Sequence, residues 1–166
     1  HPMHEKFMAR AIEIAGESID QPGTLPYGAV VVLNGEVVGE GLNRAEATCD
    51  PTSHGEVDAI RDACAKLSVS SLKGADLYTS GEPCAMCVAT MYQAGIARLF
   101  YAADAADSGA FFGRLVVHDP KWARAMNNQK LREQVGLPVV ERSMVSEQMM
   151  VADIVAVFEA FIERHT

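Results

Sequence analysis

The fold is decided by residues 75–102, ADLYTSGEPCAMCVATMYQAGIARLFYA. Residues 75–80 have the composition of a strand, and residues 84–94 have the length and pattern of a short helix opened by Pro83. Residues 98–102 predict a second strand. A strand, a helix and a strand in this order predict two parallel strands joined by a right-handed crossover.

The flanking chain supplies the other elements of the predicted fold. Residues 5–20 repeat apolar side chains with a helical period, which predicts a first helix. The β-rich runs 27–33 and 36–42 flank Asn34-Gly35, a dipeptide that suits a tight hairpin turn because both positions accept positive φ. We expect a loop over 43–53, a helix over 54–67, a loop over 103–120, a helix over 120–134, a strand over 138–142 and a closing helix over 146–164. Residues 1–166 are thus predicted to form a single α/β domain, a three-layer α-β-α sandwich with a five-stranded mixed sheet.

The composition is that of a globular protein with an acidic balance. The 166 residues include 22 acidic and 14 basic side chains, a formal net charge of −8, and the basic residues are scattered. Such a charge repels polyphosphate, so we expect a small-molecule substrate and no nucleic acid as partner. No apolar run reaches the roughly eighteen residues of a membrane helix, and no secretory leader is recognisable, so we expect no membrane partner.

Four cysteines in a chain of this length do not form the pattern of a disulfide framework. We expect a cytoplasmic protein, because a reducing compartment keeps thiols available for metal binding.

A metal site is predicted by His54-x-Glu56 and, about thirty residues later, Pro83-Cys84-x-x-Cys87. Cys84 and Cys87 are three residues apart, so the first turn of a helix directs both sulfurs to one side. One imidazole and two thiolates suit a zinc ion that keeps its fourth position open for water. Glu56 is placed to take a proton from that water and pass it to a substrate. We expect one Zn²⁺ per chain, with Glu56 as the catalytic acid and base.

Two other interpretations of these residues remain open. Cys84-x-x-Cys87 follows a strand and opens a helix, as thioredoxin-type redox pairs do, although such chemistry has no use for His54-x-Glu56. A structural zinc site needs a fourth ligand, which Cys49 in the preceding loop is near enough to supply. Cys64 lies about 15 Å along the helix from His54 and is too distant.

The same motif carries a family resemblance, since zinc deaminases of nucleobases share H-x-E…P-C-x-x-C. The chain resembles the cytidine-deaminase-like superfamily, in particular the branch of guanine deaminase, cytosine deaminase and tRNA adenosine deaminase. The resemblance implies a helix–sheet–helix sandwich, one catalytic zinc, hydrolytic release of ammonia, and assembly as a homodimer. The matching residues are Pro26–Val30, Asn43, Asp50–Ile60, Leu77–Ser80 and Glu82–Cys87.

The resemblance also implies substrate contacts. Asn43 matches the asparagine that hydrogen-bonds the bound ring; otherwise it is a loop residue that supports left-handed backbone. The backbone around Gly81 would lie beside the attacked carbon, and Gly55 would allow the backbone to approach the ring closely. The resemblance implies that zinc is bound by His54, Cys84 and Cys87 and that Glu56 transfers protons.

The loop after the fourth strand departs from guanine deaminase, which has an acidic side chain there. This chain has Gly109–Gly113 at that point, without a carboxylate. Asp104 or Asp107 is a candidate replacement, and either is equally a solvated loop residue. Phe111 and Phe112 are expected to stack on the substrate ring or to pack locally.

These observations predict a zinc-dependent hydrolytic deaminase of a small amino-heterocycle, guanine or a related nucleobase or nucleoside. One alternative is a cytosine- or cytidine-type deaminase, and another is a tRNA adenosine deaminase, which the net charge disfavours. The remaining alternative is a non-catalytic, zinc-bound partner module.

Overall fold

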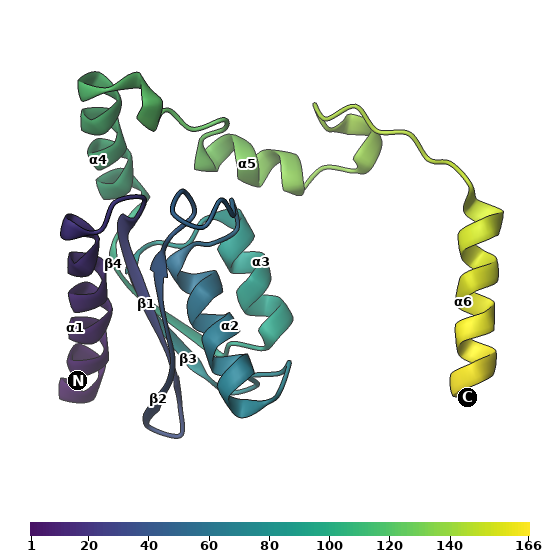
Figure 1. Ribbon diagram of the computed structural model, residues 1–166, viewed down its shortest axis with the longest axis horizontal. Helices are drawn as coiled ribbons and strands as arrows, with labels where there is room; N and C mark the ends of the chain where they lie inside the picture. Colours follow the sequence, from purple (N-terminus) through teal and green to yellow (C-terminus); the bar gives the residue numbers. More distant parts are fainter. The chain divides into compact units, whose positions relative to one another are not determined.

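A four-stranded sheet with the strand order β2-β1-β3-β4 organises the first part of the chain (Figure 1). The computed structural model describes residues 1–166 and groups them into two units, His1–Asn128 and Gln129–Thr166. The strands are β1 (Leu25–Leu33), β2 (Glu36–Asn43), β3 (Asp76–Gly81) and β4 (Arg98–Ala103).

The hairpin and the parallel crossover predicted from the sequence are both present. β1 and β2 are antiparallel around Asn34 and Gly35, whose φ values are 53° and 77°. β1 also pairs antiparallel with β3, whereas β3 and β4 are parallel and are joined through α3 (Ala85–Ala94).

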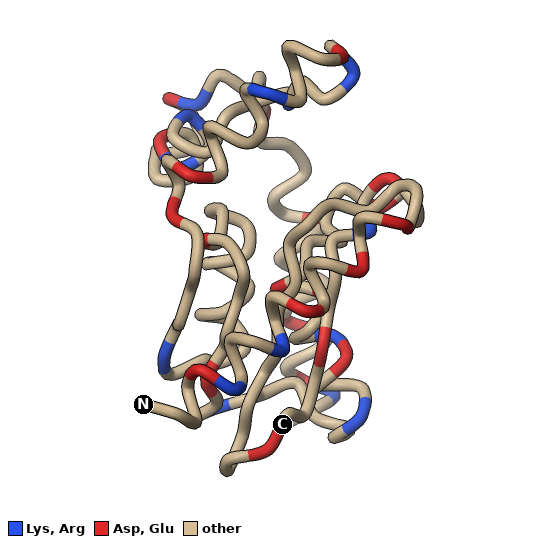
Figure 2. The backbone as a smooth tube through the Cα atoms, turned by 90° about the vertical axis from the view of Figure 1, so that its left-hand side faces the viewer, with Lys and Arg blue, Asp and Glu red and all other residues tan.

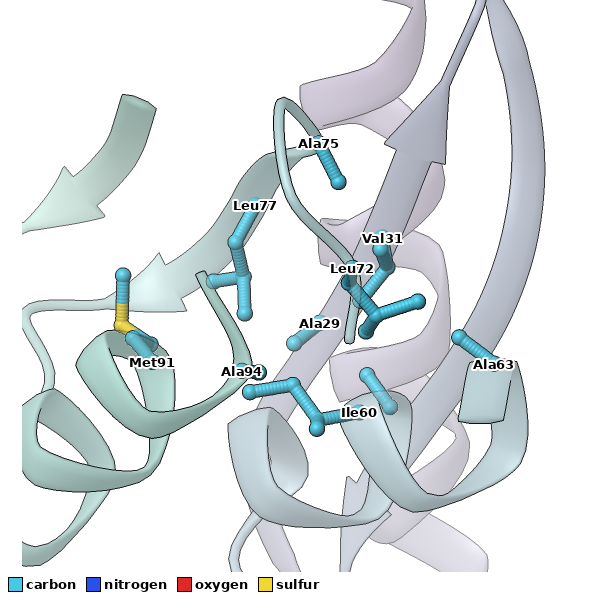
Figure 3. Close-up of a cluster of buried hydrophobic side chains, with 10 residues drawn as sticks. Ala29, Val31, Ile60, Ala63, Leu72, Ala75, Leu77, Met91 and Ala94 are labelled. Atoms are coloured by element: carbon cyan, nitrogen blue, oxygen red, sulfur yellow. The ribbon is translucent and has the colours of Figure 1, made fainter. Parts of the chain in front are cut away.

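Helices cover both faces of this sheet, which makes three layers (Figure 1). α1 (Pro2–Glu17), continued by a 3₁₀ turn over Ser18–Asp20, covers one face. α2 (Gly55–Leu67) and α3 cover the other. On this second face the buried cluster of Figure 3 joins strands to helices through Ala29, Val31, Ala59, Ile60, Ala63, Leu72, Ala75, Leu77, Met91 and Ala94. The cluster under α1 comprises Phe7, Ala11, Ile14, Val30, Val32, Leu42 and Tyr78.

The expected loop over 103–120 is wrong, because α4 (Ala105–His118) occupies most of it. A reciprocal capping box opens this helix: the Asp104 side chain accepts from the backbone N–H of Asp107, and the Asp107 side chain accepts from that of Asp104. Two glycines, at positions 109 and 113, hide the helical periodicity in the sequence. The capping spacing was the available signal for this helix. A 3₁₀ turn over Pro120–Trp122 follows α4.

The expected fifth strand is also wrong. Residues 138–142 lie in the second unit, where Val139–Glu141 forms a 3₁₀ turn after Pro138. Two adjacent valines favour extended backbone, but a strand also needs a paired neighbour, and strand propensity depends strongly on that context. The sheet therefore has four strands, with β2 and β4 at its edges.

The second unit contains two α-helices, which begin later than the sequence predicted. They are α5 (Asn128–Val135) and α6 (Val151–His165), where helices were expected over 120–134 and 146–164. No helix of the structure has the length and apolarity required to cross a bilayer.

Candidate metal centre and active site

His54, Cys84 and Cys87 bring their ligand atoms together in a small triangle. Sγ of Cys84 lies 3.6 Å from Sγ of Cys87, and each sulfur lies 3.5 Å from Nδ1 of His54. No other group of three or more potential ligand side chains is close enough to hold a metal ion.

This triangle has the dimensions that a zinc ion requires. Tetrahedral zinc with Zn–S of about 2.3 Å and Zn–N of about 2.0 Å separates two sulfurs by roughly 3.8 Å and a sulfur from a nitrogen by roughly 3.5 Å. The measured edges agree with these values within a few tenths of an ångström. Two soft thiolates and one imidazole also match the donor preference of zinc. The residues present therefore fit this metal.

Two helix starts place the three ligands. His54 is the N-cap residue of α2 and Cys84 is the N-cap residue of α3, both with extended backbone, and Cys87 lies in the first turn of α3. The positive end of each helix dipole points toward the cluster and favours anionic sulfur. This arrangement agrees with the sequence argument that two helical openings must face each other.

The two thiols differ in acidity because they share hydrogen bonding. Hydrogen bonding with Cys87, supported by His54, lowers the pKa of Cys84 to about 4. Hydrogen bonding with Cys84, burial and the nearby Glu56 carboxylate raise the pKa of Cys87. The hydrogen bond with Cys84 raises the pKa of His54. These interactions also show that the Glu56 carboxylate lies beside the ligand cluster.

Glu56 is buried, with 4% of its surface exposed, and Thr79 fixes its orientation. The Thr79 hydroxyl donates to Oε1 of Glu56 at 2.6 Å. Thr79 lies on β3 and has no exposed surface, so the carboxylate is held between the sheet and the start of α2. Sequence reasoning did not identify Thr79, and only the alternation of β3 side chains indicates that it faces α2.

Gly55 directly follows the candidate ligand His54, and Gly81 lies two residues after Thr79 at the end of β3. Asn43 ends β2, is 6% exposed, and accepts a hydrogen bond from the backbone N–H of Ala45. A Cβ on Gly55 would collide with the carbonyl oxygen of Tyr27, and a Cβ on Gly81 would lie 2.7 Å from the Tyr27 ring. The two glycines therefore allow the start of α2 and the end of β3 to close on Tyr27.

Asp107, Phe111 and Phe112 lie on α4 rather than on a loop. The Asp107 carboxylate serves the helix cap described above. Phe111 makes an edge contact with Tyr27 at 6.3 Å between ring centroids, and Phe112 stacks parallel to Tyr27 at 6.0 Å. Both aromatic side chains therefore pack around Tyr27. A pocket of about 140 Å³ beside this packing is lined by Pro26, Tyr27, Ser80, Ala103, Asp107, Ser108 and Phe111.

Tyr27 and Arg124 are two further site residues that sequence reasoning did not single out. Burial raises the pKa of Tyr27, and interactions with Ser108 and Arg124 partly offset that effect. The sequence does not predict that Arg124 lies near Tyr27, because Arg124 follows α4 and a 3₁₀ turn and lies 97 positions after Tyr27.

The two remaining cysteines lie outside the metal group. Cys49 is exposed in the turn before α2, and its sulfur lies 3.9 Å from the carbonyl oxygen of Glu46. Cys64 is half-buried on α2 and packs against the core of Figure 3.

The chain matches one described protein family and several known deaminases. Residues 2–103 match the family described as cytidine and deoxycytidylate deaminase zinc-binding region. Guanine deaminase of Bacillus subtilis (strain 168) is 44% identical over 109 residues, which are 64% of this chain and 70% of that protein. The tRNA-specific adenosine deaminase of Agrobacterium fabrum is 41% identical over 104 residues, which are 63% of this chain and 68% of the relative.

Solved structures give the same grouping. The X-ray structure of guanine deaminase from Bacillus subtilis superimposes with a TM-score of 0.81 and 32% identity, covering 96% of this chain and 94% of that one. A structure of NE0047 in complex with 2,6-diaminopurine gives a TM-score of 0.61 and 30% identity, covering 64% of this chain and 60% of that chain. The family match covers more than half of this chain, and the ligand triangle has the geometry for zinc. The chain belongs to the cytidine and deoxycytidylate deaminase zinc-binding family.

Proposed function

We propose that the protein is a zinc-dependent hydrolytic deaminase that releases ammonia from guanine or a closely related amino-heterocycle. The observation that carries this proposal is the buried Glu56 carboxylate beside the His54, Cys84 and Cys87 triangle. A structural zinc site has no need of a buried carboxylate that is held by its own donor next to the ligands.

We assign one zinc ion to each chain, bound by His54, Cys84 and Cys87. When bound, zinc lowers the pKa of a water molecule and so supplies the nucleophile at neutral pH. Glu56 would carry one proton from the attacking water to a ring nitrogen. It would then carry the proton of the hydroxyl left on the ring carbon to the departing amine, so that a ring oxo group forms and ammonia leaves. Thr79 keeps the carboxylate oriented through these transfers. Asn43 holds the ring, and the backbone at Gly55 and Gly81 borders it.

Guanine-type rings are favoured as substrates by a sequence relative and by a solved structure that covers nearly the whole chain. The Bacillus subtilis relative named guanine deaminase shares 44% of the matched residues, and its structure covers 96% of this chain. The bound 2,6-diaminopurine in the structure of NE0047 is also an aminated purine base. A free purine base or its nucleoside is therefore the substrate that we test first.

The second candidate function is deamination of adenosine in tRNA, which the Agrobacterium fabrum relative favours. The net charge of −8 opposes it, and Figure 2 shows basic residues interleaved with acidic ones rather than gathered in one stretch. RNA binding depends on cations that displace counterions from the phosphates. Salt-dependent binding to tRNA would support this candidate and weaken the first.

We further propose that the protein is a cytoplasmic homodimer. Four free cysteines support a reducing compartment. Support for the dimer comes from α6, where Ile154, Phe158 and Phe161 share one helical face and are 46%, 56% and 63% exposed. Large apolar side chains arranged in this way are typical of surfaces that another chain covers.

An ammonia-release assay tests the proposal directly. Zinc-loaded protein would be incubated with guanine, cytosine, adenine, their nucleosides and aminotriazines. We expect turnover of guanine or a near relative, and a loss of about 100-fold or more in Glu56→Gln with the zinc content unchanged. Ammonia from cytosine or cytidine alone would move the substrate class to pyrimidines. No ammonia from any ring would leave the zinc-bound partner module as the function.

A further inference from the structure

The guanidinium of Arg124 lies at the edge of the site, on a segment that follows the 3₁₀ turn after α4. Its Cζ is 3.4 Å from the centroid of the Phe112 ring, which is within the range of a cation–π contact. Phe112 in turn stacks on Tyr27 with an angle of 3° between the rings. The Tyr27 ring borders Gly81 at the end of β3. Arg124, Phe112 and Tyr27 therefore form a row of successive side-chain contacts, the aromatic row, which ends at the backbone of Gly81.

The charge of Arg124 acts on the site itself. Burial lowers the pKa of Arg124, while Tyr27 and Cys84 raise it, and Arg124 in turn lowers the pKa of His54. Tyr27 also interacts electrostatically with Glu56. Arg124 stays protonated at any working pH because the guanidinium pKa is far above neutrality. A fixed positive charge, held by Phe112, therefore lies close enough to Tyr27 and the metal ligands to interact with them electrostatically.

A guanidinium presents hydrogen-bond donors and no acceptor. A ring that places an exocyclic oxygen opposite the guanidinium accepts a charge-assisted hydrogen bond from it. An amino group at the same position presents N–H donors to the N–H donors of the guanidinium, so no hydrogen bond forms. We propose that Arg124, supported by Tyr27 and Phe112, contacts the substrate and selects rings that carry an exocyclic oxo group. This inference rests on the proposed deaminase function and names the substrate feature that the site reads.

Guanine and 2,6-diaminopurine provide the test, because they share the purine ring and the 2-amino group. They differ at position 6, where guanine carries an oxo group and 2,6-diaminopurine an amino group. We would measure kcat/KM with both rings for the wild type, Arg124→Met and Arg124→Lys. Methionine keeps an unbranched side chain against Phe112, and lysine restores the charge without the fork of donors. Lys121→Ala is the matched control, since it removes a nearby cation that lies 5.1 Å from the centroid of the Trp122 ring. Thermal unfolding would confirm that each variant is folded.

We expect Arg124→Met to lose roughly 10- to 100-fold with guanine and less than about threefold with 2,6-diaminopurine. Arg124→Lys should recover part of the loss, and Lys121→Ala should match the wild type. An equal loss with both rings, or no loss with either, would overturn the inference.

A binding measurement separates this inference from the proposed function. The Kd of each ring would be measured on zinc-loaded Glu56→Gln protein, with and without Arg124→Met. If the wild type releases no ammonia but guanine affinity still depends on Arg124, the deaminase proposal fails and the recognition role stands. If Arg124→Met leaves the ratio of the two affinities unchanged, the recognition role fails whatever the turnover.

Discussion

The Thr79 hydroxyl donates a 2.6 Å hydrogen bond to Oε1 of Glu56, and both side chains are buried. The same hydroxyl oxygen accepts from the backbone N–H of Gly81 at 3.4 Å, so one side chain links the carboxylate to the end of β3. A buried carboxylate needs such a donor, because leaving it unsatisfied costs about 1–3 kcal/mol or more. We therefore expect Thr79 to act on the proposed reaction through Glu56 rather than on the substrate.

Replacing Thr79 by valine tests this role, since valine keeps the shape and removes the hydroxyl. We expect kcat to fall roughly 10-fold or more, with KM nearly unchanged, because the carboxylate loses its orientation and its donor. Thr79→Ser keeps the hydroxyl and should retain most of the activity. Steady-state kinetics and zinc content on the three proteins check the prediction. Wild-type kcat in Thr79→Val would show that Glu56 is oriented by other groups.

Replacing one of the candidate metal ligands should weaken zinc binding. Cys87→Ser should lower zinc affinity by at least about 10-fold, because a hydroxyl replaces a thiolate in the ligand triangle. The apo protein should also unfold at a lower temperature, since a preformed ligand triangle binds zinc more tightly than the unfolded chain does. Atomic absorption and thermal unfolding after chelation measure both effects. Cys49→Ser is the matched control, and loss of zinc from that variant would indicate a fourth protein ligand.

The pair of cysteine ligands and the hairpin could be predicted from the sequence because both depend on short spacings. Cys84-x-x-Cys87 brings two sulfurs together within one helical turn, and Asn34-Gly35 defines its own turn geometry. Residues 138–142 failed as a strand because pairing depends on a neighbour that the local sequence does not specify.

Thr79 and Arg124 were missed for a related reason. Arg124 reaches the aromatic row only because α4 and the following 3₁₀ turn carry it back toward Phe112. The hydrogen bond of Thr79 depends on how α2 packs on the sheet. Contacts of this kind depend on tertiary packing, which no local pattern in the sequence encodes.

The ion pair between α1 and β2 predicts a dependence of stability on pH. Nε and Nη2 of Arg10 donate to the two carboxylate oxygens of Glu40 at 2.6 and 3.0 Å. This hydrogen bonding lowers the pKa of Glu40 below its ordinary value. A carboxyl with a depressed folded pKa stabilises the fold above the unfolded pKa, and the contribution disappears as the pH falls through the folded value.

We therefore expect Glu40→Gln to lower the free energy of unfolding by about 0.5–1 kcal/mol at pH 7, a modest effect because both side chains are about one-third exposed. The difference from the wild type should shrink as the pH falls below about 4.5. Urea denaturation at several pH values measures it. Glu13→Gln is the control, because Glu13 pairs with the same Arg10 from an exposed position. A difference that grows in acid would contradict the assigned sign.

The exposed apolar face of α6 is expected to contribute to the proposed dimer interface. Phe158 and Phe161 lie three residues apart on that helix and are 56% and 63% exposed. A stable dimer buries about 800 Å² on each partner, and two phenylalanines would supply a substantial part of it. We expect Phe158→Asp combined with Phe161→Asp to shift the protein from dimer to monomer, measured by light scattering coupled to gel filtration across a concentration series. Glu159→Gln with Glu163→Gln alters charge on the same helix and should leave the dimer intact. A wild type that remains monomeric at every concentration would contradict the proposed assembly.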